Sequence, residues 1–297
     1  MRMISAQDLC WTGERKPIAQ RECRYSQRFC IAGVCFDLRS NDREVIVELT
    51  RRFEEHLSER PAQFTYFVIA SDDEYVFQCA HDGSWRWRHG PLSTGAVAFL
   101  ADAAMMAAVV HFDPQLMSMH AAAFAYNGRA GAIAGDSTAG KTTTLLACAR
   151  AGVAVYSDER TLVRSGNVHP FLRICSVRSA GRDRLLLDAA DDRLARVLSS
   201  SSLFTFTQAF GPAVVAPVEP LDALFVLNGY ASVPEIERID TAQALPAISR
   251  WFDAAAGSLD RLARAVTLLR SVRCYRLTLG TPAASAQKIM EVMESTE

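Results

Sequence analysis

The sequence feature that most restricts the fold is the segment Gly135 to Thr142, which reads Gly-Asp-Ser-Thr-Ala-Gly-Lys-Thr. It fits the pattern Gly-x-x-x-x-Gly-Lys-[Ser/Thr] at every fixed position. The segment follows an apolar run, AGAIA, that is typical of a buried strand, and it leads into a helical run, TTTLLACAR. A strand, a glycine-containing loop and a helix in this order bring backbone N–H groups and the positive end of a helix dipole to one point. The sequence therefore predicts a phosphate-binding loop in an α/β fold.

Two side chains at the end of this loop carry the chemistry that a nucleotide needs. Lys141 is predicted to neutralise the β- and γ-phosphates of ATP, and the Thr142 hydroxyl to complete the Mg²⁺ shell. Only three of the 32 basic residues are lysines, so a lysine here is unusual for this chain. The alternative is a chance glycine turn before a helix, which the strand and helix on either side disfavour. The predicted nucleotide-binding residues are Gly135, Asp136, Ser137, Thr138, Ala139, Gly140, Lys141, Thr142 and Thr143.

Two adjacent carboxylates, Asp158 and Glu159, end the apolar run that follows the helix. In a phosphate-binding fold, a carboxylate at a neighbouring strand end faces the phosphates and can hold Mg²⁺. One carboxylate can then bind the metal while the other accepts a proton from an attacking hydroxyl. Without the phosphate loop, the simpler reading is a solvated turn into Arg160. With it, we predict that Asp158 and Glu159 are catalytic and that Asp158, with Thr142, binds the metal.

The charge balance excludes some classes of partner. The chain has 32 basic and 33 acidic residues and a formal net charge of -1, so no overall field attracts nucleic acid or an anionic membrane. The most apolar segment, 96–112, is interrupted by Asp102 and indicates a buried helix and not a membrane span. The amino-terminal residues lack an apolar signal segment, and the eight cysteines contain no Cys-x-x-Cys pair. We therefore expect a cytoplasmic protein without a zinc site or a disulfide framework.

Hydrophobic patterning divides the chain near residue 92. Residues 1–92 are predicted to form a small α+β domain, with a strand or hairpin over 29–40, a helix from 45 to 57 and short antiparallel strands up to 91. Residues 93–297 show alternating strands and helices, which favours an α/β domain. There the expected helices cover 95–111, 141–151, 181–198, 241–270 and 283–294, and the expected strands cover 119–126, 130–134, 153–157, 221–228 and 274–280.

One histidine, His120, stands in the expected strand 119–126, where a lone histidine is more often a core residue than a catalytic one. Its surroundings change that reading. The stretch SMHAAAFAYNGRAGAIAGDSTAGKTTTLLACARAGVAVYSDERTLV, residues 118–163, resembles the core of the HPr kinase/phosphorylase family. The resemblance lies in the Ser-Met-His strand, the Gly-Asp-Ser-x-x-Gly-Lys-[Ser/Thr] loop and the acidic strand end, in this order and at this spacing.

The resemblance implies a fold like that of phosphoenolpyruvate carboxykinase and unlike that of the Ras-type proteins. It places His120 near the attacking hydroxyl, assigns the loop to the phosphates and Mg²⁺, makes Asp158 a metal ligand or base, and makes Glu159 its partner carboxylate. Glu159 stands where the family has a second aspartate, and Thr138 replaces a loop glycine, which a negative φ would tolerate. The family's signature beyond the acidic strand end is not recognisable in HPFLRICSVRSAGRDR, residues 169–184. For that reason HPr itself and phosphorolysis are not expected.

Three arginines in this divergent region, Arg173, Arg178 and Arg182, are candidates to clamp a phosphate or an acidic substrate group. Surface arginines on a loop are the simpler reading of the same residues.

The sequence thus favours an ATP-dependent kinase that transfers the γ-phosphoryl group to a serine of a peptide or protein. By analogy with divergent members of the family, a lasso-type ribosomal precursor peptide is the leading candidate acceptor. Two alternatives stay open: a kinase for a small hydroxyl compound such as free serine, and a nucleotide-binding regulatory module without transfer activity. Residues 1–92 are expected to recognise the substrate. The sequence leaves open whether the chain forms a homo-oligomer.

Overall fold

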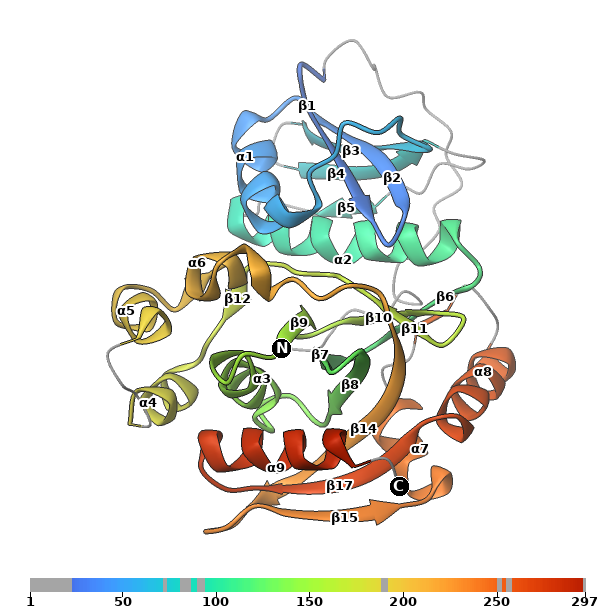
Figure 1. Ribbon diagram of the computed structural model, residues 1–297. Helices are drawn as coiled ribbons and strands as arrows, with labels where there is room; N and C mark the ends of the chain where they lie inside the picture. The colour runs from blue at the N-terminus through green and yellow to red at the C-terminus, as the bar shows by residue number, and fades with distance from the viewer. Residues whose placement is uncertain are drawn as a thin grey trace. The chain divides into compact units, whose positions relative to one another are not determined.

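The computed structural model describes residues 23–71, 74–80, 87–89, 94–187, 192–249, 253–254 and 258–295. The chain divides into two compact units, Met1–Asp113 and Pro114–Glu297, and each is described by itself. Figure 1 labels the helices and strands.

The first unit contains a sheet with the strand order β1-β2-β3-β4-β5. Its elements are β1 (Tyr25–Ile31), β2 (Val34–Ser40), α1 (Arg43–Arg52), the 3₁₀ turn Glu54–His56, β3 (Phe64–Ser71), β4 (Glu74–Ala80), β5 (Trp87–His89) and α2 (Thr94–Phe112). The predicted hairpin, helix and antiparallel strands are all present. Ala32 and Gly33 both have positive φ, which is the geometry of a tight hairpin turn between β1 and β2.

This hairpin carries a disulfide bond between Cys30 and Cys35, which face each other in the register of β1 and β2. The sequence argued against a disulfide framework and did not foresee this single bond. The turn at Ala32 and Gly33 brings the two cysteines, five residues apart, opposite each other. Cys148, Cys175 and Cys274 are buried as free thiols.

The boundary between the units lies about one helix later than the expected division at 92 and 93. Helix α2 contacts α1 and β4, and the ring of Phe112 near its end packs on Phe64 of β3 with centroids 5.4 Å apart. α2 therefore belongs to the first unit. Its apolar character on all sides showed that it is buried but not which sheet it covers. Among the helices that the structure describes, none combines the length and the apolar character required to cross a membrane.

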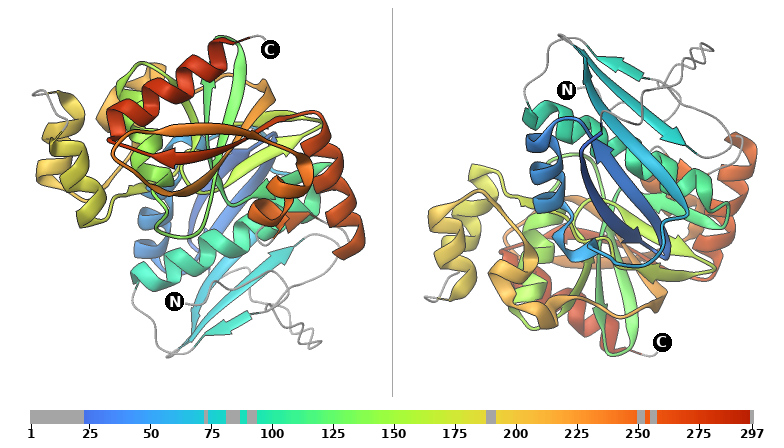
Figure 2. Two further views of the ribbon diagram at one scale, coloured as in Figure 1. Left: turned by 90° about the horizontal axis from the view of Figure 1, so that it is seen from below. Right: turned by 90° about the horizontal axis from the view of Figure 1, so that it is seen from above.

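The second unit is a mixed α/β structure in which helices cover both faces of a sheet (Figure 2). Its strands are β6 (Leu116–Met119), β7 (Ala121–Tyr126), β8 (Arg129–Ala134), β9 (Ala154–Ser157), β10 (Thr161–Arg164), β11 (Asn167–His169), β12 (Cys175–Ser176), β13 (Leu203–Phe204), β14 (Glu219–Tyr230), β15 (Glu235–Ile239), β16 (Asp253–Ala254) and β17 (Arg273–Leu279). Its helices are α3 (Lys141–Arg150), α4 (Ser179–Leu187), α5 (Arg193–Ser200), α6 (Phe206–Phe210), α7 (Thr241–Ser249), α8 (Ser258–Arg270) and α9 (Pro282–Glu294), with a 3₁₀ turn at Pro212–Val214.

The centre of this sheet is three parallel strands, with β14 between β8 and β17. β7 runs antiparallel to β8, and β9 runs antiparallel to β7. On one face, α3 and α9 lie side by side over the stacked rings of Phe124, Phe225 and Tyr275. On the other face, α7 and α8 pack against strands that present mainly alanine. Both faces of the central parallel strands are therefore covered, as is usual for parallel sheets.

Three expected elements of this unit are divided in the structure. The expected strand 119–126 breaks at His120 into β6 and β7, which pair with different neighbours. The expected helix 181–198 becomes α4 and α5, and the side chain of Asp192 caps α5 by accepting from the N–H of Ala195. The expected helix 241–270 becomes α7 and α8, because β16 between them pairs with β6. In the two helical segments, the helical periodicity of the sequence continued across the breaks and concealed them.

Candidate functional site

The predicted site residues gather at one edge of the second unit's sheet. Ala134, the last residue of β8, pairs with Ala121 of β7, so the loop that begins at Gly135 lies next to His120. β9 has the same direction as β8, because both run antiparallel to β7, and it ends at Ser157 immediately before Asp158. The carboxyl ends of parallel strands are where open α/β sheets bind ligands. The topology thus brings together three segments that are separate in the sequence.

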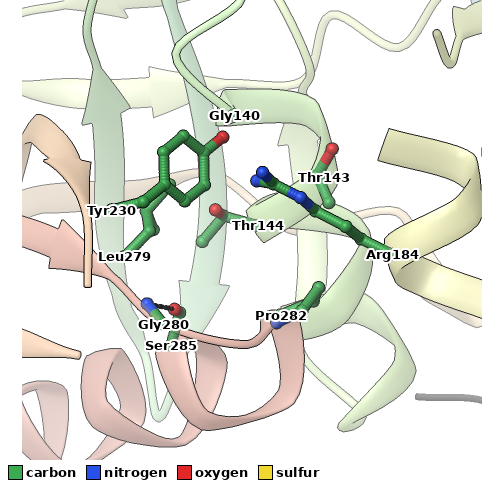
Figure 3. Close-up of a pocket in the computed structure, with 9 residues that line it drawn as sticks. All are labelled: Gly140, Thr143, Thr144, Arg184, Tyr230, Leu279, Gly280, Pro282 and Ser285. Atoms are coloured by element: carbon green, nitrogen blue, oxygen red, sulfur yellow. Dashed lines mark hydrogen bonds between the residues drawn. The ribbon is translucent and has the colours of Figure 1, made fainter. Parts of the chain in front are cut away.

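The phosphate loop has the backbone of a cradle. Gly140 has a φ of 108° and stands directly before the first residue of α3. A Cβ on Gly140 would lie 2.6 Å from the hydroxyl oxygen of Tyr230 and 2.8 Å from Cδ1 of Leu279. The positive φ favours glycine at this position, and a Cβ would also require the side-chain ends of Tyr230 and Leu279 to move (Figure 3).

The backbone conformation of Thr138 differs from the one expected for a threonine in this loop. Its φ is +75°, not negative, so a β-branched residue adopts the left-handed conformation in the middle of the loop. Such a conformation costs roughly 1–2 kcal/mol for a residue with a Cβ. The loop holds this residue under local strain, at the place where the resembling family has glycine.

Lys141 is buried, with 7% of its surface exposed. Its ammonium donates hydrogen bonds to the carbonyl oxygens of Gly135 and Asp136, at 2.9 and 3.0 Å. Burial lowers the pKa of Lys141, although the carboxylates of Glu159, Asp136 and Asp158 act in the opposite direction and Arg178 acts with burial. The lysine therefore lies within electrostatic range of both predicted catalytic carboxylates.

The two carboxylates have different surroundings. Asp158 is buried, and the buried Cys175 thiol hydrogen-bonds to it; burial and this carboxylate raise the pKa of Cys175 well above its usual value. Glu159 forms an ion pair with Arg173. Burial alone would raise the pKa of Glu159, but Arg173, His120 and Arg160 outweigh it, and the pKa is lowered. Glu159 is thus held as a carboxylate, while Asp158 lies deeper beside a neutral thiol.

His120 is half-buried at the break between β6 and β7, and its side chain hydrogen-bonds to the backbone of Glu159. Burial lowers its pKa to about 4, with Lys141 and Arg160 acting in the same direction and Glu159 against them. The imidazole is therefore neutral near pH 7. His120 thus lies beside the acidic strand end and within electrostatic range of the loop lysine, and its catalytic role stays a prediction.

The three candidate arginines have separate positions. Arg173 joins the site through Glu159 and lies 5.5 Å from the centroid of the Phe171 ring. Arg178 is exposed but close enough to lower the pKa of Lys141. Arg182 lies beside Asp183, at 3.9 Å.

Sequence reasoning missed Cys175, Arg184 and Tyr230. The Tyr230 hydroxyl donates to the carbonyl oxygen of Ala139 in the loop at 3.2 Å, and the Arg184 guanidinium carbon lies 4.2 Å from the centre of the Tyr230 ring. Tyr230 is at the end of β14, which runs beside β8. Only the pairing of β14 with β8 reveals that Tyr230 lies beside the loop, because Tyr230 is far from the loop in the sequence.

The residues present fit a nucleoside triphosphate with Mg²⁺. The loop turns at a glycine with a positive φ, its lysine is buried at the loop, and the buried carboxylate of Asp158 lies within electrostatic range of that lysine. Thr142, at the start of α3, and Asp158 supply the hydroxyl and carboxylate oxygens that Mg²⁺ prefers.

Comparisons with known proteins give little further information. No protein-family model matches the chain, and no curated protein matches it. Among solved structures, the chain is similar to the Hpr(Ser) kinase/phosphatase from Coxiella burnetii, with 11% identity and a TM-score of 0.30, over 60% of this chain and 99% of that chain. A TM-score this low supports no conclusion about the fold or the function of this chain. The resemblance of residues 118–163 to the HPr kinase/phosphorylase family therefore stays a prediction.

Proposed function

We propose that this chain is an ATP-dependent phosphotransferase that moves the γ-phosphoryl group to a hydroxyl, with serine of a peptide or protein as the acceptor. The observation that supports the proposal is the arrangement at the sheet edge. The buried Lys141 ammonium bonds to the Gly135 and Asp136 carbonyls of the loop, and the strand ends beside this loop carry His120 and Asp158. A phosphate-binding lysine next to acid–base side chains is the arrangement that phosphoryl transfer requires.

Asp158 is the proposed base. It would accept the proton of the acceptor hydroxyl while the oxygen forms its bond to the γ-phosphorus and the bond to the leaving ADP oxygen breaks. The same residue is within the set that would hold Mg²⁺, with Thr142, and the metal when bound supplies neutralising charge to the β- and γ-phosphates.

Glu159 and His120 have positioning roles in this proposal. The ion pair with Arg173 fixes Glu159 as a charged group, so it is unsuited to take a proton near pH 7. Neutral His120 would orient the acceptor hydroxyl by a hydrogen bond. A protonated imidazole that stabilises the transferring phosphoryl group is disfavoured, because the pKa of His120 is about 4.

The nature of the acceptor rests on the sequence resemblance and not on the site. Serine on a peptide or protein, including a lasso-type precursor, is the acceptor that the resemblance implies. The first unit is the proposed recognition module for that acceptor; its edge strand β1 is exposed at Tyr25, Ser26 and Arg28.

Transfer of label from γ-³²P-ATP tests the proposal. The protein is incubated with Mg²⁺, labelled ATP and a cell extract, and the products are separated by size, with Asp158→Asn as the matched control. We expect label in a peptide or protein with the wild type alone. Label in a small metabolite would replace the acceptor class with a small hydroxyl compound. Binding of ATP without any label transfer would contradict the phosphotransferase and favour a regulatory nucleotide-binding module.

A further inference from the structure

A disulfide bond joins the two strands of the β1–β2 hairpin in the first unit. Cys30 of β1 and Cys35 of β2 stand directly opposite each other in the register of these strands, and their Sγ atoms are bonded. Cys35 is buried, whereas Cys30 is half-buried. Access is one of the factors that decide which sulfur of a disulfide a small thiol attacks. Attack is therefore favoured at the sulfur of Cys30.

The hairpin does not depend on this bond for its shape. β1 and β2 pair along their whole lengths, Tyr25–Ile31 and Val34–Ser40. The rings of Phe29 and Phe36 pack across the two strands with centroids 5.7 Å apart. A disulfide adds least stability where it closes a short loop, and here the hairpin turn already closes the loop. The strands can therefore stay paired when the bond is broken.

A guanidinium group lies beside the sulfur of Cys30. Nη1 of Arg60 donates to Sγ of Cys30 at 3.7 Å. A positive charge next to a cysteine sulfur stabilises the thiolate, which is the reactive form in thiol–disulfide exchange. Arg60 is thus placed to stabilise the charged form that Cys30 takes when its bond to sulfur is broken.

Hydrogen bonds to β1 hold the backbone that carries Arg60. The N–H of Ser58 donates to the carbonyl oxygen of Arg28 at 3.2 Å. The Arg28 guanidinium in turn donates to the carbonyl oxygen of Glu59 at 3.2 Å. The N–H of Arg60 donates to the Ser58 hydroxyl, also at 3.2 Å. The guanidinium therefore starts from a backbone that is fixed against the strand of Cys30.

Three free cysteines of the second unit differ from this pair. Cys148, Cys175 and Cys274 are buried thiols. Burial raises the pKa of Cys148 to about 12 and is the main cause that raises the pKa of Cys274 to about 11. Buried thiols that stay neutral are inert to exchange. These three cysteines therefore provide an internal reference for the hairpin pair.

We propose that Cys30 and Cys35 form a reversible thiol–disulfide site that reacts with low-molecular-weight thiols such as glutathione. In the first step, a glutathione thiolate bonds to Sγ of Cys30, the bond between the two cysteines breaks, and Cys35 leaves as a thiolate that takes a proton. In the second step, another glutathione thiolate attacks the bound glutathione sulfur, and Cys30 leaves as a thiolate beside Arg60. The two cysteines are thereby reduced, and two glutathione molecules are oxidised to their disulfide. Oxidised glutathione drives the same steps in reverse.

Equilibration of the whole chain in glutathione buffers tests the proposal. Samples at a series of ratios of reduced to oxidised glutathione are quenched with acid, free thiols are alkylated in denaturant, and mass spectrometry assigns the state of each cysteine. We expect Cys30 and Cys35 to change together from disulfide to dithiol within the series, while the circular dichroism spectrum keeps its folded form. The three buried cysteines should carry no glutathione at any ratio. This site lies in the first unit, so the result does not depend on the proposed phosphotransferase.

Variants test the parts assigned to single residues. In Cys35→Ser, oxidised glutathione should form a mixed disulfide with Cys30, and Cys35 in Cys30→Ser should react about tenfold more slowly because it is buried. Adding Arg60→Ala to Cys35→Ser should slow the reaction about threefold, since a smaller thiolate fraction is partly offset by greater nucleophilicity. Arg60→Lys should restore most of the rate. Arg43→Ala removes an exposed arginine on α1 and is the matched control, with no change expected.

Several results would overturn the proposal. A bond that stays intact in excess reduced glutathione would make the disulfide purely structural, and a pair that stays reduced in oxidised glutathione would equally exclude a reversible site. Loss of the folded circular dichroism signal on reduction would show that the hairpin depends on the bond. Faster reaction at Cys35 than at Cys30, or an unchanged rate after Arg60→Ala, would overturn the roles assigned to Cys30 and Arg60.

Discussion

The ammonium of Lys141 donates to the carbonyl oxygen of Gly135 at 2.9 Å, so the first residue of helix α3 bonds back to the first residue of the phosphate loop. A second bond to Asp136 holds the same ammonium. The lysine thus closes the loop on itself and keeps its charge at the centre of the predicted phosphate site. Because this charge is buried, it is less screened than a surface lysine and interacts more strongly with phosphate.

Replacement of the lysine should remove nucleotide binding. We expect Lys141→Ala to weaken ATP binding by at least tenfold, since one cation that neutralises the β- and γ-phosphates is lost. Lys141→Met, which keeps most of the side-chain volume, should show the same loss with a smaller change in melting temperature. Isothermal calorimetry measures the affinity, and Lys288→Ala is the control because Lys288 is an exposed lysine on α9. Undiminished affinity in both Lys141 variants would mean that the loop does not bind the nucleotide.

Neutralisation of the buried carboxylate should stop transfer and spare the fold. Asp158→Asn keeps the shape of the side chain, and we expect label transfer to fall about 10²- to 10⁴-fold, as for other positioned acid–base groups. Glu237→Gln, an exposed carboxylate on β15, should transfer at the wild-type rate. Turnover and melting temperature are measured on the same preparations. Near-wild-type turnover in Asp158→Asn would exclude this residue as the base.

The lowered pKa of His120 predicts a pH dependence of stability. The pKa is about 4 in the folded protein and about 6.5 in the unfolded chain, so between these values the unfolded chain binds more protons. The titration of His120 therefore leaves the free energy of unfolding unchanged above pH 6.5 and lowers it as the pH falls from 6.5 toward 4. His120→Gln should remove this part of the slope. Melting temperatures of both proteins between pH 4 and 7.5 provide the check, and identical profiles would contradict the shift.

His120 should affect turnover more than nucleotide affinity. If its neutral imidazole orients the acceptor hydroxyl, His120→Ala lowers the transfer rate and leaves ATP binding nearly unchanged, because the contact forms with the acceptor and not with ATP. Transfer rate, ATP affinity and melting temperature are compared on one preparation. A variant that melts early but transfers normally when folded would assign His120 a purely structural role.

Thr138 offers a test of the strained loop. Thr138→Gly relieves roughly 1–2 kcal/mol of left-handed strain and costs about 0.5–1 kcal/mol of backbone entropy. We expect the melting temperature to stay level or to rise by a few degrees. Ser137→Gly is the matched control, since the neighbouring residue has no positive φ and should only lose stability. A larger loss of stability at 138 than at 137 would contradict the strain.

The local sequence was sufficient to predict those helices, strands and loops whose conformation depends on residues close together in the chain. Gly135, Gly140 and Lys141 predicted the strand, the loop and helix α3, because each conformation there is set by glycine freedom, strand burial and helix propensity. The spacing to Asp158 was also informative, since β9 follows α3 directly in the chain. The positive φ of Thr138 was missed, because a residue type does not fix a backbone angle that the whole loop imposes.

Tertiary structure decided how the remaining residues are placed. His120, which the sequence resemblance put near the attacking hydroxyl, lies beside the loop because β7 pairs with β8 in a register that sets Ala121 against Ala134. Arg173 reaches Glu159 through an ion pair between two loop residues. Tyr230 reaches Gly140 only after β14 has paired with β8. The same holds for α2, whose apolar surface determined burial while packing against Phe64 determined the unit that buries it. Sequence specifies short-range geometry directly, whereas pairing register and side-chain packing depend on contacts that form only in the folded chain.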